Sequence, residues 1–245
     1  MKEKRAFIVD ASSDIGPQFD MVHERMVYDS AAEFNAPHAI LLTHAHIGHY
    51  TGLMFYGYEG LSASRIPVYC TSKMARFLEE NGPWSQLVRY ENIALQIIRP
   101  EEEISLTPRI SFTPLLVPHR DEYSDTVGFI IAGPKKSLLY IPDIQSWEAW
   151  NRSIKEEVRR TDYAILDGTF FSPDELPGRD LSKIGHPFIT ASMDVLGPVA
   201  KSGKTRIYFT HLNHTNLALD PDGPEQKEIT KKGFHLASDG MEIML

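Results

Sequence analysis

Three histidines within six residues place the strongest limit on what this chain can be. His44, His46 and His49 follow residues 40–43, a short apolar run that is typical of a buried strand. In an extended loop that leaves a strand, residues 44 and 46 point to the same side, and His49 comes round as the chain turns into residues 51–59, which we expect to be helical. Neutral imidazoles are good ligands for Zn, Fe and similar ions. The spacing therefore predicts a metal-binding loop, and the alternative is a polar loop of hydrogen-bonded histidines.

Composition limits the kind of metal site and the kind of partner. Cys70 is the one cysteine among 245 residues, so a metal would have to be held by histidines and carboxylates rather than by a cysteine-rich site. A formal net charge of −8 disfavours a nucleic-acid partner, because neutralising many phosphates needs a basic face. No stretch approaches the roughly 20 apolar residues that a membrane span needs. We expect a cytoplasmic protein without a signal peptide that acts on a small molecule, with a homodimer left open.

Strands and helices are expected to alternate along the chain without a low-complexity linker, which predicts one α/β domain over residues 1–245. Strands are expected at 6–10, 40–43, 67–70, 93–98, 110–117, 126–132, 137–141, 163–166 and 206–210, with two short ones at the end. Helices are expected from the N-cap Thr71 to Asn81-Gly82 and at about 146–160, 190–201 and 224–232. Trp147 and Trp150 have the helical spacing of core residues.

The histidine loop resembles the H-x-H-x-D-H signature of the metallo-β-lactamase superfamily. His119, Asp143 and His211 then follow in the order that the superfamily uses, and each stands at the end of an expected strand. The resemblance implies an α/β fold of the four-layer αβ/βα sandwich type. It also implies that these side chains converge on one edge of the sandwich.

The resemblance further implies the metal ligands. A first site would consist of His44, His46 and His119, and a second of His49, Asp143 and His211. Gly48 stands where the superfamily has an aspartate ligand, so the sequence leaves open whether one or two ions bind. Zn is the expected ion, with Fe or Mn as alternatives.

Longer segments resemble pyrroloquinoline quinone biosynthesis protein B and its relatives. They are residues 10–15, 167–170, 185–188 and 210–216. The N-terminal strands and the cysteine-rich segment of that family have no counterpart in this sequence. The likeness supports an alternative function, an iron-dependent oxygenase or hydroxylase step in the modification of a cofactor or peptide. Two histidines and one carboxylate, the set left at the second site, are also the ligands of many mononuclear iron oxygenases.

The leading prediction is a metal-dependent hydrolase in which metal-bound hydroxide attacks a small anionic ester or phosphodiester. Asp143 would bridge two ions or orient the hydroxide. Asp167 and His186 resemble the glutamate and histidine with which ribonuclease Z-like phosphodiesterases protonate the leaving group. The alternative for this pair is a hydrogen bond that only orders a loop.

Three further residues are predicted to contact substrate. His214 and Asn216 follow the ligand His211 closely and could line the pocket or support a metal ligand. Arg120, beside His119, could pair with an anionic substrate. The alternatives are solvated loop positions for the first two residues and a surface salt bridge for Arg120. A metal-loaded binding protein without catalytic activity is a third possibility for the whole chain.

Overall fold

The computed structural model describes residues 5–25 and 37–245, which divide into two compact units. Unit 1 comprises residues up to Arg99 together with Asp121–Thr126, and unit 2 comprises Pro100–Arg120 and Val127–Leu245. Each unit has its own sheet and its own hydrophobic core. The predicted α/β class is confirmed, whereas the single domain over 1–245 stays a prediction.

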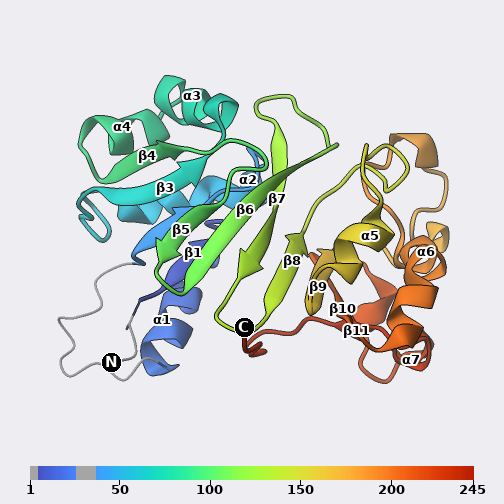
Figure 1. Cartoon of the computed structure of the whole chain (residues 1–245). Coiled ribbons are helices and arrows are strands. Elements are labelled where there is room, and N and C mark those ends of the chain that lie inside the picture. The colour runs from blue at the N-terminus through green and yellow to red at the C-terminus, as the bar shows by residue number, and fades with distance from the viewer. Residues whose placement is uncertain (1–4, 26–36) are drawn as a thin grey trace. The chain divides into compact units, whose positions relative to one another are not determined.

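Unit 1 is built on a sheet of four parallel strands in the order β1-β2-β3-β4 (Figure 1). The strands are β1 (Phe7–Val9), β2 (Ala39–Leu41), β3 (Ile66–Cys70) and β4 (Ile93–Ile97). The helices are α1 (Ile15–Arg25), α2 (Ile47–Tyr50), α3 (Ser72–Glu80) and α4 (Trp84–Arg89), with a 3₁₀ helix at Thr51–Tyr56. Short parallel strands joined by helical segments are what the alternating sequence pattern predicts.

The core of unit 1 packs the apolar strands against the apolar side of α3. Ile40, Val68 and Ile93 lie in one cluster with Met74 and Leu78. Burial of each such side chain contributes about 1.5–3 kcal/mol to folding.

Cys70 belongs to the same core and has no exposed surface. Burial, together with the charges of Glu79 and Asp125, raises the pKa of its thiol to about 12. Cys70 is therefore a core side chain and not a nucleophile.

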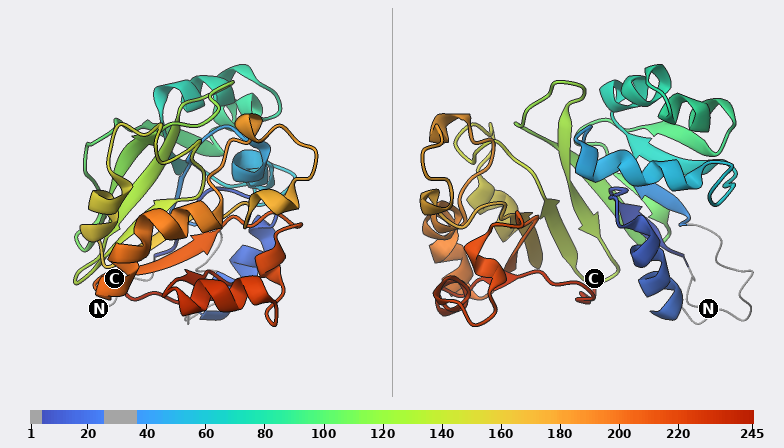
Figure 2. Two further views of the ribbon diagram at one scale, coloured as in Figure 1. Left: turned by 90° about the vertical axis from the view of Figure 1, so that its right-hand side faces the viewer. Right: turned by 180° about the vertical axis from the view of Figure 1, so that it is seen from behind.

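Unit 2 is built on a seven-stranded sheet in the order β11-β10-β9-β8-β7-β6-β5 (Figure 2). The strands are β5 (Ile104–Thr107), β6 (Ile110–Val117), β7 (Thr126–Ala132), β8 (Ser137–Ile141), β9 (Tyr163–Asp167), β10 (Arg206–Thr210) and β11 (His235–Leu236). The helices are α5 (Ile154–Arg159), α6 (Ile189–Ser202) and α7 (Pro224–Lys231), and short 3₁₀ helices lie at Pro173–Glu175, Leu181–Lys183 and Leu217–Leu219. Strands β8 to β11 are parallel, and β7 pairs with β8 in the antiparallel sense.

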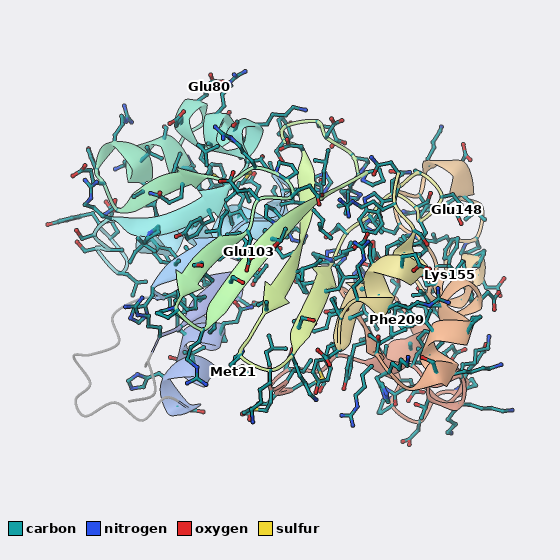
Figure 3. All side chains as sticks on the ribbon, in the orientation of Figure 1. Met21, Glu80, Glu103, Glu148, Lys155 and Phe209 are labelled. Atoms are coloured by element: carbon teal, nitrogen blue, oxygen red, sulfur yellow. The ribbon has the colours of Figure 1, made fainter. Side chains whose placement is uncertain are left out.

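Helices α5, α6 and α7 bury their apolar sides in one cluster with the central strands of unit 2. Val158 of α5 and Leu196 of α6 lie in this cluster with Leu139, Ile207 and Phe209. Phe209, labelled in Figure 3, is fully buried. Gly203 caps the C-terminal end of α6 with a positive φ of 68°, a conformation that suits glycine.

The helix predicted at 146–160 is wrong in its first half, because α5 begins only at Ile154. Trp147 and Trp150 are core residues, as predicted, but each indole N–H is held outside a helix. Trp147 donates to the Ser192 hydroxyl and Trp150 to the Leu116 carbonyl, both at 2.8 Å. These hydrogen bonds hold both tryptophans outside a helix, so their helical spacing reflects tertiary packing and not helix formation.

Other features also differ from the sequence prediction. Helices α1, α2 and α4 and strand β5 were not predicted, and the helix expected at 51–59 is a 3₁₀ helix that ends at Tyr56. Of the two strands expected at the end of the chain, the described residues form only β11. None of the helices in the described ranges is long and apolar enough to cross a membrane.

Candidate functional site

Polar side chains gather where parallel strands end in each unit. In unit 1, Asp10 follows β1 and His44 follows β2, and these strands pair with Val9 opposite Leu41. In unit 2, Asp143 follows β8, Asp167 ends β9 and His211 follows β10, all on parallel strands. The carboxyl ends of neighbouring parallel strands meet at one edge, which explains why residues distant in sequence converge.

The three histidines of the unit 1 loop lie together, as predicted. The ring centre of His44 lies 4.5 Å from that of His46 and 4.2 Å from that of His49. Nε2 of His44 and Nδ1 of His46 are 2.8 Å apart. His44 and His49 are buried, so the cluster brings imidazole nitrogens together out of water.

Asp10 holds this cluster in place, a role that the sequence analysis missed. Its carboxylate accepts a hydrogen bond from Nδ1 of His49 at 2.7 Å, and further bonds from the backbone N–H and the hydroxyl of Thr43. The bond to Asp10 puts the proton of His49 on Nδ1 and the ring's lone pair on Nε2. Asp10 has a positive φ of 62°, a conformation that aspartate adopts more readily than most residues.

The segment Asp121–Thr126 braces the same loop. Nε2 of His46 lies 3.2 Å from a carboxylate oxygen of Glu122, and the hydroxyl of Ser124 accepts a hydrogen bond from the Ala45 N–H at 2.8 Å. Both contacts span more than 70 sequence positions, so no local pattern could have revealed them.

A second cluster in unit 2 surrounds the buried carboxylate of Asp143. One of its oxygens lies 3.7 Å from Nε2 of His119 and 3.7 Å from Nδ1 of His186, and the other lies 3.4 Å from Nε2 of His211. Ligand atoms at about 2.0–2.1 Å from a tetrahedral zinc ion stand roughly 3.3–3.4 Å apart. The spacing and the mixed histidine and carboxylate chemistry therefore fit a transition metal.

Asp167 and His186 form the pair that the sequence predicted. Nδ1 of His186 donates to a carboxylate oxygen of Asp167 at 2.8 Å. Asp167 is fully buried and also accepts hydrogen bonds from Ile144 N–H and from the N–H and hydroxyl of Thr169. Burial lowers the pKa of His186, but the hydrogen bond to Asp167 and the charges of Asp167 and Asp143 outweigh it, so that this pKa lies above its ordinary value.

Thr169 joins this pair to His211 and was also missed. Its hydroxyl donates to Asp167 at 2.8 Å and lies 2.9 Å from Nδ1 of His211 and 3.1 Å from Nδ1 of His186. Because the hydroxyl proton is used on Asp167, its oxygen accepts from Nδ1–H of His211. The lone pair of the His211 ring is then on Nε2, which lies 3.4 Å from a carboxylate oxygen of Asp143.

The three predicted substrate contacts differ in their surroundings. Asn216 is buried, and its amide bonds to backbone groups of Gly168, Thr169 and Ala218. Asn216 therefore positions the segment that carries Thr169, and its contact with substrate stays a prediction. The backbone of Gly185, next to His186, lies against the side chains of Arg120 and His119.

Two predictions about the site remain predictions. The substrate contacts of Arg120 and His214, both exposed, are the first. The second is the metal set that takes ligands from both histidine clusters. Within unit 2, ligand atoms of His119, Asp143 and His186 lie within 4.8 Å of one another, as do those of Asp167, His186 and His211.

Comparisons with known proteins identify relatives of the chain. The model of the beta-lactamase superfamily domain matches residues 5–212. Coenzyme PQQ synthesis protein B of Pseudomonas fluorescens (strain Pf0-1) is 29% identical over 228 residues, which cover 84% of this chain and 73% of that protein.

Solved structures show the same fold. Zn(2+)-bound PqqB from Methylobacterium extorquens is similar with a TM-score of 0.80 and 22% identity, over 99% of this chain and 84% of that one. A diphosphatase from the PhnP family is similar with a TM-score of 0.63 and 21% identity, over 97% of this chain and 79% of that one. The predicted metallo-β-lactamase fold is therefore confirmed.

Proposed function

We propose, on the premise that this chain belongs to the beta-lactamase superfamily, that it is a metal-dependent hydrolase of small anionic esters or phosphodiesters. The observation that carries the proposal is the Asp167–His186 hydrogen bond beside the carboxylate of Asp143. Such a pair supplies a proton donor next to the residues whose chemistry fits a metal. The diphosphatase with the same fold is a hydrolase of a related class.

The proposed ligands come from both histidine clusters. They are His44, His46 and His49 of unit 1, and His119, Asp143 and His211 of unit 2. A transition metal held by such residues acts as a Lewis acid and supplies a water nucleophile at neutral pH. We propose zinc, since imidazole and carboxylate are zinc ligands and the PqqB of Methylobacterium extorquens binds Zn(2+).

His186 is proposed to donate a proton to the leaving group. Its Nδ1–H is held by Asp167, which fixes the ring orientation and leaves Nε2 as the atom that carries the proton to be transferred. Asp167 is itself held by three hydrogen bonds from neighbouring groups, so the pair is rigid before substrate binds. Rigidity of this kind lowers the reorganisation that proton transfer needs.

Arg120 is proposed to bind the anionic part of the substrate. It is exposed and lies with His119 against the backbone just before His186. A guanidinium pairs with phosphate or carboxylate oxygens through two parallel N–H bonds, which gives selectivity for anions.

Substitution of His186 tests the proposal. We expect His186→Asn to lower kcat/KM for an alkyl phosphodiester by about 10²–10⁴-fold, the usual contribution of a general acid. The loss should be much smaller for a 4-nitrophenyl ester, whose leaving group departs without a proton. The measurement is steady-state hydrolysis of both substrate types by zinc-loaded protein.

One control variant and two contradicting outcomes complete this test. His235→Gln changes an exposed histidine outside both clusters and should leave both rates unchanged. Equal losses of rate for good and poor leaving groups would assign His186 a structural role. Hydrolysis that survives both His44→Ala and His119→Ala would contradict the hydrolase proposal as a whole.

The similarity to coenzyme PQQ synthesis protein B favours a second candidate, iron-dependent oxidation of a cofactor precursor or peptide. It differs from hydrolysis in metal and in co-substrate. Elemental analysis of protein purified without added ions, combined with oxygen uptake in the presence of tyrosine-containing peptides, separates the two. Zinc without oxygen uptake would exclude the oxidation.

A further inference from the structure

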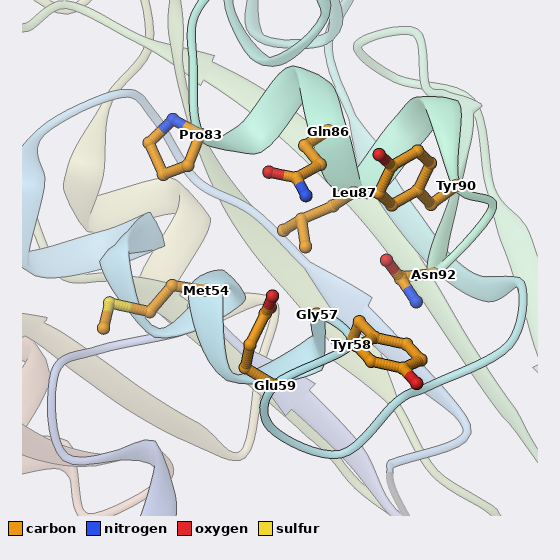
Figure 4. A pocket seen from close by; sticks show the side chains of 9 residues that line it. All are labelled: Met54, Gly57, Tyr58, Glu59, Pro83, Gln86, Leu87, Tyr90 and Asn92. Atoms are coloured by element: carbon orange, nitrogen blue, oxygen red, sulfur yellow. The ribbon is translucent and has the colours of Figure 1, made fainter.

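A small cavity of about 70 Å³ lies in unit 1 and is lined by none of the residues of the histidine cluster (Figure 4). Its walls come from the end of the 3₁₀ helix and the loop after it, from helix α4, and from Asn92 just before β4. The cavity would hold a small organic group. None of the residues proposed for hydrolysis lines this cavity.

Asn92 contributes an unsatisfied acceptor to this cavity. The residue is 7% exposed, and its Nδ2 donates to the Ala63 carbonyl at 2.9 Å. Its Oδ1 is buried and has no hydrogen-bond partner among the described residues. Figure 4 shows the oxygen end of this amide turned toward Leu87 and the nitrogen end turned away. A buried acceptor of this kind favours a ligand that brings a donor.

The charges around the cavity define the kind of donor. Glu59 places a carboxylate in the wall, and the lining residues, all within the described part of the chain, include no Lys, Arg or His. An anionic ligand would therefore meet the like charge of Glu59 and no cationic side chain among the lining residues. Tyr58 and Tyr90, 75% and 64% exposed, add aromatic rings, whose faces attract cations.

We propose that this cavity binds a primary alkylammonium group, from a small amine or from a lysine side chain. The ammonium donates to Oδ1 of Asn92 and is attracted by Glu59, while the alkyl chain lies along Leu87 and Met54. Gly57 leaves space for the alkyl chain, because a methyl group at residue 57 would stand only 3.1 Å from a Leu87 methyl carbon. This site is independent of the proposed hydrolysis.

Titration of the ¹⁵N-labelled full chain with n-butylammonium tests the site. We expect saturable shifts of the Asn92 side-chain amide signals, and binding at least about tenfold tighter than that of n-butanol or butyrate. Shifts centred on other residues, or equal binding of butyrate, would overturn the proposal. Nα-acetyl-lysine methylamide identifies the source: tighter binding than butylammonium indicates a lysine side chain, and weaker binding a small amine.

Variants give the same test a second readout. Glu59→Gln should weaken the Kd of n-butylammonium about fivefold, the size of one exposed ion pair. Gly57→Ala should weaken it further by narrowing the cavity, with amide spectra used to verify folding. Glu80→Gln, on the exposed end of α3, is the matched control and should leave the Kd unchanged (Figure 3). An unchanged Kd in Glu59→Gln would also contradict the proposal.

Discussion

The hydroxyl of Thr169 fixes which nitrogen of His211 can bind a metal. It donates to Asp167 and accepts from Nδ1 of His211 at 2.9 Å, so removing it leaves that N–H without its acceptor. We expect Thr169→Val, which keeps the shape of the side chain, to weaken zinc binding by about 10–100-fold. Competition with a chromophoric chelator measures the affinity.

Thr169→Ser is the matched control for this prediction. Serine retains the hydroxyl and loses only a methyl group, so zinc affinity should stay within about threefold of the unmodified chain. A loss in Thr169→Ser as large as that in Thr169→Val would show that packing, and not the hydrogen bond, determines the affinity.

Unit 1 repeats the same arrangement around Thr43. The Thr43 hydroxyl donates to Asp10 and lies 2.9 Å from Nδ1 of His44. The Thr169 hydroxyl makes the corresponding contacts with Asp167 and His211. The histidines are predictable from sequence because their side chains carry the metal chemistry themselves. The threonines and Asp10 are not, because their roles arise from contacts such as Asp10–Thr43, which spans 33 positions.

Helix α3 begins at a cap that contributes measurably to stability. The Thr71 side chain accepts a hydrogen bond from the Met74 N–H at 3.3 Å, and it also bonds to Asp125. Thr71→Ala should lower the free energy of unfolding by about 1 kcal/mol, whereas Thr71→Ser should retain most of it. Urea denaturation measures both, and equal stability of the unmodified chain and Thr71→Ala would contradict the role of the cap.

Helices and strands could be predicted where a local sequence signal agrees with the tertiary packing. The cap at Thr71 and the Asn81-Gly82 turn define α3 within one residue, and the apolar run at 110–117 coincides with β6. The helix expected at 146–160 failed because Trp147 and Trp150 owe their spacing to tertiary hydrogen bonds. Strand β5 was missed because it is only four residues long, so its alternating pattern does not stand out from the neighbouring loops.

For the molecule as a whole, the central consequence of the proposal is that folding and metal binding are coupled. Each unit carries its own cluster of buried histidines and carboxylates. Burying the carboxylate charges of such a cluster costs free energy of folding unless a cation offsets them. A metal that binds only the folded chain stabilises it by about 2.7 kcal/mol at a free concentration 100-fold above Kd. For a chain of 245 residues this corresponds to a rise in Tm of roughly 5–10 °C.

Calorimetry with and without zinc tests this coupling in each unit separately. His44→Ala in unit 1 and Asp143→Asn in unit 2 should each reduce the zinc-induced rise in Tm, whereas His235→Gln should leave it unchanged. The rise is the informative quantity rather than Tm itself, because replacing a buried residue changes stability in the absence of metal as well. If only Asp143→Asn reduced the rise, the ligands would be confined to unit 2, and the proposed role of the unit 1 histidines would be wrong. If neither variant reduced it, zinc would bind elsewhere on the chain.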